Sequence, residues 1–542
     1  MDQSGASLKT YTRRCQWIIA LIPFFFFLLF FILPIMRMLQ EAGNSSFKEV
    51  RELVTKTTFW NIAWFTFWQA CVSTFLSIAV SFPTVYLLAK YDFRGRKLLR
   101  TLLTVPFILP TVVVGSAFNA MFTRLNLNDG SFQLRHTIWA IFLAHIFFNS
   151  SIAIRVISTY WENLDSRPEE QARLLGGNKR KVFFQITLPR LMPAVRSSAS
   201  LIFLFCITSF AVILMLGGPG KATIETEIWR QAIWRGDFTS ASALAFIQIF
   251  FVVIISLLFN HDGKKSQIHD YLSTRRTQKL SYRSSIFHFF YISVLFGLPI
   301  TFLIERSIRN SNGYSLQFFK ALGEKTNILP VSPISSLFNS LQFAFIASFL
   351  AVFIGILAST LIVHGGRLFS TFINTTLTLP IGVSAVTLGF GILLFYTGPL
   401  ANLRDSRWIV PALHAVLGIP FVIRNLVPSM MRIPQKFYDN ALLLGTSPIK
   451  IWKDIDLKLS WRPLLVGAGF SFAISLGEFG ATSFIPRQAD RLTAPLVIFR
   501  LLGTPGDSLR GQAMALSVLL LLITAIVILL IERIRPSEDF EF

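Results

Sequence analysis

The sequence is poor in charged residues, in acidic residues above all, and in cysteine. Charged residues make up 15% of the 542 positions, with 28 Asp and Glu against 51 Lys and Arg. Cys15, Cys71 and Cys206 are scattered without the spacing of zinc ligands, so neither a disulfide framework nor a metal site is indicated. The pattern G-x-x-x-x-G-K-[ST] is absent, and residues 217–223 and 262–266 only approach it. We therefore expect no cofactor, no metal and no nucleotide-cradling loop.

Apolar residues dominate what is present. Hydrophobic residues make up 53% of the chain, and 55 residues are phenylalanine, which is more apolar surface than a water-soluble core can hide. A helix needs about 20 apolar residues to cross a bilayer. Because no segment alternates like a barrel strand, the sequence predicts an all-α integral membrane protein with about twelve transmembrane helices. The candidate spans are 17–39, 59–89, 100–122, 138–159, 196–216, 240–259, 286–305, 336–363, 368–396, 408–428, 464–484 and 512–531.

The formal net charge of +23 could suggest a nucleic-acid partner, but the basic residues are placed as in a membrane protein. Lys and Arg gather after the second, fourth, sixth, tenth and twelfth candidate spans. Loops rich in these residues stay on the cytoplasmic side. We therefore expect a multi-pass protein in a lipid bilayer, with both termini cytoplasmic and no nucleic acid bound. The loop that holds Arg230 and Arg235 runs against this pattern.

The chain contains an internal repeat. Residues of "WAIFLAHIFFNSSIAIR" recur 269 residues later in "WIVPALHAVLGIPFVIR", and "LTVP" recurs as "LTLP" 274 residues later. Each copy holds about six spans, so both enter the membrane from the same side as parallel repeats. The sequence predicts one domain at 1–260, a basic linker at 261–285 and a second domain at 286–542. Repeated pairs include Trp139 and Trp408, His145 and His414, Arg155 and Arg424, Gly176 and Gly445, Phe210 and Phe479, and, at the longer shift, Gly115 and Gly389.

One charged loop occurs in each copy, at about 160–195 and about 429–463. In the first, "EQARLLGGNKRKVFFQITLPR", Glu170 suits the first turn of a short helix and Gly176 suits its end. Ala172, Leu175 and Gly176 share one face, which suggests docking on a partner. The alternative is an amphipathic helix in the lipid headgroups, with the adjacent phenylalanines at 183–184 entering the bilayer.

The spacing in these loops resembles the EAA motif of permease subunits in binding-protein-dependent ABC importers. The matching residues are Glu170, Ala172, Gly176, Ile186, Leu188 and Pro189 in the first copy, and Asp439, Ala441, Gly445, Ile455 and Leu457 in the second. Gln171, Asn440 and Lys458 depart from the motif, which makes the second copy the weaker match.

The resemblance implies the type I importer fold in the bacterial inner membrane. In that family the short helix of each motif couples the permease to an ABC ATPase subunit, of which two copies would bind on the cytoplasmic side. A periplasmic binding protein would deliver the substrate. By this resemblance the chain is a translocation subunit and no enzyme.

Several stretches look most like permeases for thiamine and thiamine pyrophosphate. They are "FWQACVSTFLS" at 67–77, "LAHIFFN" at 143–149, "LFCITSFAVILMLGGPGKATIETEIWRQAI" at 204–233 and "SLGEFGATSF" at 475–484. A ferric-iron permease of the same fused type is the alternative. A carrier driven by protons or sodium is a weaker one, because such a carrier would need midplane ionisable relays, which are few in this sequence.

A substrate pathway can also be suggested. Glu478 is the one acid inside the eleventh candidate span, and acids at membrane depth are functional candidates by default. Thiamine is a cation, for which an acid and aromatic faces are suitable neighbours. Ser209 is the counterpart of Glu478 in the first copy, and Phe210 and Phe479 follow these two positions. An ion pair or hydrogen bond to a neighbouring helix would explain Glu478 equally well.

Overall fold

A computed structural model describes residues 7–44, 48–128, 133–218, 220–260, 278–311, 313–397, 406–485 and 491–534. The chain forms two compact units, and each is described by itself. The first-copy unit holds Arg51–Glu227 and Ile247–Ser315, and the second-copy unit holds Met1–Val50, Ile228–Phe246 and Leu316–Phe542. Positions 261–277 of the predicted linker and both chain termini lie outside the described residues.

The first-copy unit is helical apart from two short strand pairs. Strands β1 and β2 pair in parallel, with Tyr91 opposite Gln278, and β3 and β4 pair antiparallel, with Arg309 opposite Tyr314. Its elements are α3 (Lys48–Thr55), α4 (Thr57–Lys90), β1 (Tyr91–Asp92), α5 (Arg96–Leu102), α6 (Val105–Ile108), α7 (Thr111–Arg124), α8 (Ile138–Glu162), α9 (Arg167–Leu174), α10 (Lys179–Val182), η2 (Phe183–Thr187), α11 (Leu188–Ile207), α12 (Ala211–Leu216), α13 (Ile224–Trp229), β2 (Gln278–Lys279), α15 (Tyr282–Ile292), η5 (Ser293–Gly297), α16 (Leu298–Ile308), β3 (Arg309–Asn310) and β4 (Gly313–Tyr314).

Only helices are described in the second-copy unit. A buried apolar cluster from α18, α20 and α21 forms its core, joined by Phe27 and Phe31 of the first span. The elements are α1 (Ser7–Phe27), η1 (Leu28–Ile32), α2 (Leu33–Asn44), η3 (Arg230–Arg235), α17 (Gln317–Ala321), α18 (Pro333–His364), α19 (Arg367–Thr378), η6 (Leu379–Ile381), α20 (Ala385–Phe395), α21 (Ile409–Met431), α22 (Gln435–Leu443), α23 (Pro448–Ile451), η8 (Trp452–Leu457), α24 (Trp461–Gly477), α25 (Ala494–Gly503) and α26 (Asp507–Ile534). Helices α3, α13 and α14 (Phe238–Asn260) are divided between the units.

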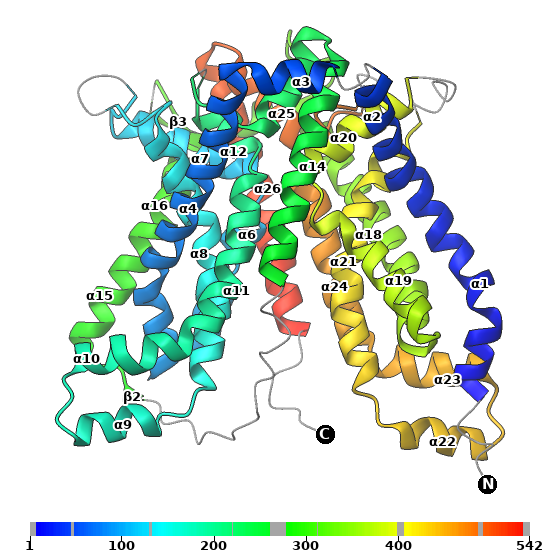
Figure 1. Cartoon of the computed structure of the whole chain (residues 1–542). Coiled ribbons are helices and arrows are strands. Elements are labelled where there is room, and N and C mark those ends of the chain that lie inside the picture. The colour runs from blue at the N-terminus through cyan, green and yellow to red at the C-terminus, as the bar shows by residue number, and fades with distance from the viewer. Residues whose placement is uncertain are drawn as a thin grey trace. The chain divides into compact units, whose positions relative to one another are not determined.

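The all-α membrane fold is confirmed, but fewer than twelve of the predicted spans are continuous helices. Among the described residues, eight helices are long and apolar enough to cross a membrane, or up to ten if each of two bent pairs is one span. One pair bends by 97° between α6 and α7. The bend lies at Leu109, which is extended because proline, here Pro110, disfavours a helical conformation of the residue before it. The predicted span at 368–396 is interrupted, as α19, η6 and α20 (Figure 1).

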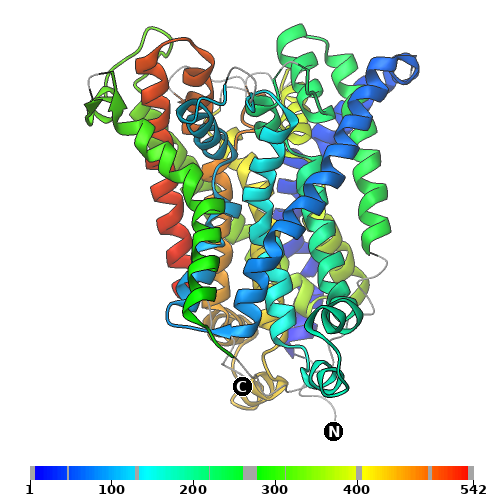
Figure 2. The same ribbon diagram turned by 90° about the vertical axis from the view of Figure 1, so that its left-hand side faces the viewer.

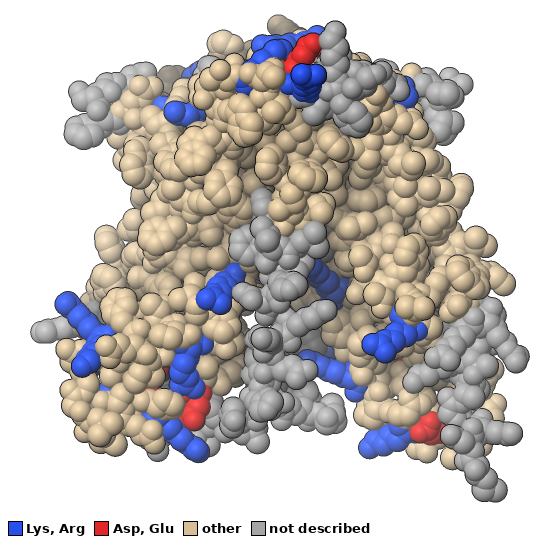
Figure 3. All heavy atoms as spheres, in the orientation of Figure 1, with Lys and Arg blue, Asp and Glu red and all other residues tan. Residues whose placement is uncertain are grey.

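Charged side chains are distributed as a bilayer requires. On the face shown in Figure 3, Lys and Arg gather toward the ends of each unit, and a broad band between them carries almost no charge. Large apolar side chains such as Phe75, Phe345 and Phe349 are exposed on long helices of the two units. A lipid environment would cover them at no cost, whereas water would not.

The first span of each sequence half belongs to the unit of the other copy. Helices α1 and α2 pack on α18 and α20, while α15 and α16 pack on α4 and α7. Both spans carry the tripeptide Leu-Pro-Ile, at 33–35 and 298–300, directly after the π-helical turns η1 and η5. Proline removes an N–H and collides with the carbonyl four residues back, and a π turn before it accommodates that defect. The repeat thus extends to the first spans, at a shift of 265 residues.

Two repeated glycines lie where helices and loops approach closely. A Cβ atom at Gly389 of α20 would lie 2.5 Å from the Cα atom of Ala481. A Cβ atom at Gly115, its counterpart in α7, would lie 2.7 Å from the Met215 sulfur. Backbone cannot move aside as a flexible methionine can, so the two glycines differ in what they tolerate.

We expect Gly389→Ala to destabilise the protein by about 1–3 kcal/mol, because the added methyl group overpacks a backbone contact. Gly115→Ala is the matched control, for which the Met215 side chain can change rotamer. Thermal unfolding of both variants in detergent micelles measures the difference. Equal melting temperatures for the two variants would show that the Ala481 backbone yields as readily as a side chain.

Candidate functional site

The two charged loops fold in the same way. Helix α9 ends at Leu174, and Gly176 follows with a φ of +86°. The N–H of Gly176 donates to Arg173 O at 3.0 Å, and that of Gly177 to Ala172 O at 2.9 Å. This is the Schellman arrangement, which satisfies the last carbonyls of a helix and favours glycine. The predicted short helix with a terminal glycine is therefore confirmed.

The second copy repeats this geometry despite its departures from the motif. Helix α22 ends at Leu443, and Gly445 has a φ of +69°. The N–H groups of Gly445 and Thr446 donate to the carbonyls of Leu442 and Ala441 at 2.9 and 3.0 Å. Both helices lie across an end of their own unit (Figures 1 and 2).

Each short helix presents two adjacent leucines to its surroundings. The exposed fractions are 87% for Leu174 and 89% for Leu175, and 76% for Leu443 and 84% for Leu444. Burying a leucine side chain is worth about 1.5–3 kcal/mol, so each loop leaves uncovered, at the same position, an apolar pair whose burial would be favourable. We call these residues the leucine pairs. Of the four, Leu175 was predicted to lie on a docking face. The face predicted from helical spacing also included Ala172, which is half-buried.

The other motif residues differ in their contacts and exposure. Ser166 Oγ donates to a Glu170 carboxylate oxygen at 3.0 Å, and Gln435 Nε2 donates to one of Asp439 at 3.2 Å. Pro189 is exposed and is the second residue after the π turn η2. The remaining motif residues are half-buried; they are Ala172, Ile186, Leu188, Ala441, Ile455 and Leu457. Phe183 contacts Trp161 at 6.1 Å between ring centroids, so it packs within its unit, whereas Phe184 is 63% exposed.

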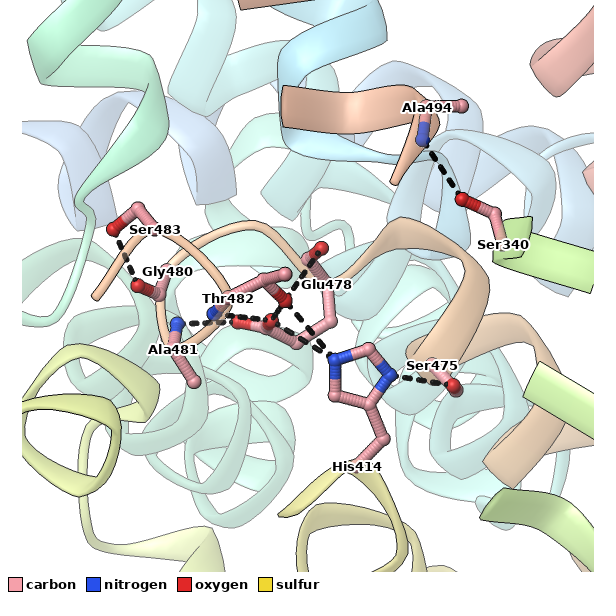
Figure 4. Close-up of polar contacts among 9 residues, drawn as sticks. All are labelled: Ser340, His414, Ser475, Glu478, Gly480, Ala481, Thr482, Ser483 and Ala494. Carbon is pink, nitrogen blue, oxygen red and sulfur yellow. Dashed lines mark hydrogen bonds and ion pairs between the residues drawn. The ribbon is translucent and has the colours of Figure 1, made fainter. Parts of the chain in front are cut away.

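The predicted pathway residue Glu478 lies just after α24, where the chain leaves the helix (Figure 4). Its two carboxylate oxygens accept the N–H groups of Ala481 at 2.6 Å and Thr482 at 2.9 Å, and the Thr482 hydroxyl as well. The residue is only 7% exposed. In this structure Glu478 therefore caps a buried turn.

In each copy a buried histidine forms hydrogen bonds at the point where a membrane helix ends, α24 in the second copy and α11 in the first. His414 Nδ1 lies 2.7 Å from Ser475 Oγ, while its Nε2 lies 3.0 Å from Thr482 Oγ1 and 3.3 Å from Glu478 (Figure 4). In the first copy, His145 lies 2.8 Å from Ser73 Oγ and 2.9 Å from Ser209 Oγ. In each copy the histidine therefore joins two helices, α8 to α4 through Ser73 and α21 to α24 through Ser475.

The two predicted pathway phenylalanines are interior side chains. Phe210 is 6% exposed and Phe479 is 2% exposed, and Phe479 packs against Phe499 with ring centroids 5.2 Å apart. A cavity of about 480 Å³ adjoins the Glu478 turn at Ser483 and Phe484. Among the described residues that line it, Arg500 is the charged one and none is acidic. No group of three or more His, Cys, Asp or Glu that could hold a metal ion occurs among the residues described.

Two like bundles, each with a capped charged loop and long apolar helices, define a duplicated membrane transport subunit. The profile of the family described as "Binding-protein-dependent transport system inner membrane component" matches residues 81–261 and 351–537. These two matches cover more than half of the chain, which therefore belongs to this family. The predicted resemblance is confirmed, and so is the predicted duplication. The family consists of inner-membrane transport components, and several membrane-spanning helices fit that location.

Similar proteins are known over nearly the full length. The chain is 26% identical over 490 residues to the thiamine transport system permease protein ThiP of Brucella abortus (strain 2308), covering 86% of each chain. It is 27% identical over 501 residues to ThiP of Haemophilus influenzae, covering 88% of each. For ThiP of Escherichia coli K12 the identity is 25% over 495 residues, which cover 89% of this chain and 90% of the relative.

Glu478→Gln is expected to lower the stability of the protein by about 1–3 kcal/mol, because an amide cannot accept all the N–H and O–H donors that now meet the carboxylate. Thermal unfolding in detergent measures this, with Glu324→Gln, an exposed acid of the same unit, as the control. An unchanged melting temperature would contradict the capping role and leave the predicted pathway role as the reason for an acid at this depth.

Proposed function

We propose that this chain is the permease subunit of an ABC importer that moves thiamine, with thiamine pyrophosphate as a further candidate cargo, across the inner membrane. The observation that carries the proposal is the pair of capped loop helices, equally spaced in both copies and each presenting two exposed leucines. Relatives aligned over more than four fifths of the chain are named thiamine permeases, which supports the choice of substrate.

In the proposed cycle the energy comes from other chains. Two copies of an ATPase subunit bind the loop helices α9 and α22 on the cytoplasmic side, and a periplasmic binding protein delivers thiamine to the opposite side. ATP-driven closure of the ATPase subunits moves the loop helices, and the helix bundles follow as rigid bodies. The chain supplies no ATPase site of its own, consistent with the missing phosphate loop. Both termini and both loops are cytoplasmic in this scheme.

Residues 1–260 and 286–542 are the two permease domains by sequence, joined by the linker, and each gives its first span to the other copy's unit. Glu478, Ser209, Phe210 and Phe479 lie where the spans break, and we propose that these breaks border the substrate path. The four side chains are hydrogen-bonded to or packed against other parts of the protein. In this proposal they therefore hold the backbone of the breaks in position, and the binding protein provides most of the selectivity.

Uptake of labelled substrate tests the function. In cells that lack their own thiamine uptake, expression of this chain with its ATPase and binding protein should give accumulation of labelled thiamine that stops when ATP is depleted. Ferric iron is offered in parallel. Accumulation of iron without thiamine would assign the chain to the ferric-iron importers, and uptake that follows a proton or sodium gradient without ATP would rule out the ABC mechanism.

Gly176→Asp tests the coupling loops. We expect uptake to fall by about tenfold or more, because a charge would enter an apolar docking surface. An added Cβ atom meets nothing within 4 Å, so the protein should still fold and reach the membrane.

Gly95→Asp is the matched control for Gly176→Asp. Gly95 has nearly the same φ, +87° against +86°, and equally open surroundings, but lies outside the motif. Any backbone strain is therefore equal in the two variants. Co-purification of the ATPase subunit should decrease for Gly176→Asp and not for Gly95→Asp, and normal transport by Gly176→Asp would refute coupling through α9.

A further inference from the structure

A buried polar contact fastens each loop helix to the end of a long membrane helix. In the first-copy unit, Lys90 Nζ lies 2.9 Å from a Glu169 carboxylate oxygen, and the other oxygen of Glu169 accepts the Thr187 hydroxyl at 3.0 Å. Lys90 also lies over the Trp161 ring, 5.4 Å from its centroid. We call Lys90, Glu169 and Thr187 the first tie. It joins the last residue of α4 to α9 and η2.

The second-copy unit contains a contact of the same form. His364 Nε2 lies 3.1 and 3.2 Å from the two carboxylate oxygens of Asp456, and the Tyr438 hydroxyl donates to Asp456 at 2.7 Å. Burial and this hydrogen bond raise the pKa of Tyr438, so that its hydroxyl remains a donor. His364, Tyr438 and Asp456 are the second tie, which joins the last residue of α18 to α22 and η8.

The two ties occupy repeat-equivalent positions with different residues. Lys90 corresponds to His364 at the shift of 274, and Glu169 and Thr187 correspond to Tyr438 and Asp456 at the shift of 269. The acid and the hydroxyl have therefore changed places. The acid sits on the loop helix in the first tie and on the π turn in the second. In both, one carboxylate lies between one basic side chain and one hydroxyl donor.

Exchanging the acid and the hydroxyl does not change how the carboxylate is hydrogen-bonded. Either order gives the carboxylate two donors and leaves no buried charge without a partner, which is the condition for tolerating such a group in the interior. The side chains concerned are well covered, with exposed fractions of 22% and 9% for Lys90 and Glu169 and of 5% and 0% for His364 and Asp456. A tilt of the loop helix away from its membrane helix would expose or separate these groups.

We propose that the two ties are positioning elements that transmit movement of the loop helices α9 and α22 to the long helices α4 and α18, and that they are equivalent devices with the acid exchanged between two elements. The inference rests on the proposed coupling function and deepens it. The leucine pairs meet the partner, and the ties keep each pair rigidly attached to a membrane span.

Removal of one acid tests the second tie. In the assembled transporter, we expect Asp456→Asn to increase amide hydrogen exchange of α22 and to lower stimulation of ATP hydrolysis by the loaded binding protein by about tenfold, because the loop helix no longer moves with α18. Stimulation is measured per assembled complex, so a variant that only folds less well leaves it unchanged. Asp454→Asn is the matched control, since Asp454 is an exposed acid in the same π turn. Equal behaviour of the two variants would overturn the proposal.

A transplant tests the equivalence of the ties. The triple variant His364→Lys, Tyr438→Glu and Asp456→Thr places the residues of the first tie in the second copy. It should recover stimulation to within about threefold of the original chain, whereas Asp456→Thr alone should not. A triple variant no better than Asp456→Thr would overturn the equivalence. Failure of thiamine uptake by the unaltered chain would instead reject the proposed substrate, because hydrogen exchange of α22 reports the tie without any cargo.

Discussion

The constraint on which this structure depends is that a backbone N–H or C=O at membrane depth must find its partner inside the protein. An uninterrupted helix pairs its backbone groups without help from side chains. Where a helix is interrupted, a side chain or a change of helix type must pair them instead. At Pro34 and Pro299 a π turn absorbs the lost hydrogen bond. After α24, where no helix continues, the carboxylate of Glu478 takes the N–H groups of Ala481 and Thr482. This carboxylate therefore satisfies backbone donors at the end of α24, and His414 contacts it from the neighbouring helix α21.

The sequence was sufficient for the fold class, the duplication and the two loop helices, because each produces a periodic or spaced signal. Gly176 and Gly445 could be placed at helix ends because a left-handed residue there favours glycine. The number of continuous spans could not be read so well, since hydropathy does not register a bend such as the one at Pro110. Nor could it show that α1 and α15 pack in the other copy's unit, because both look like ordinary first spans.

The site was predicted less completely than the fold, for a physical reason. A motif records spacing along one segment, whereas the ties join residues that are 79 and 92 positions apart, such as Lys90 with Glu169 and His364 with Asp456. Their residue types also differ between the copies, so a search for repeated identities passes over them. Leu174 was missed because an ideal helical face was assumed up to Gly176, while the helix ends at Leu174 and the chain turns at its cap.

Divergence between the copies shows which features the loops must keep. The second copy has replaced Glu170 by Asp439 and Pro189 by Lys458, yet it retains the short helix, the left-handed glycine and the leucine pair. Its tie has changed all three residue types while keeping one carboxylate between a base and a hydroxyl. Both copies therefore keep the capped helix with its leucine pair and the tie that holds it, although the side chains that form the tie differ. A loop that transmits force needs both properties, whereas a loop that merely rests in lipid headgroups would need neither the cap nor the tie.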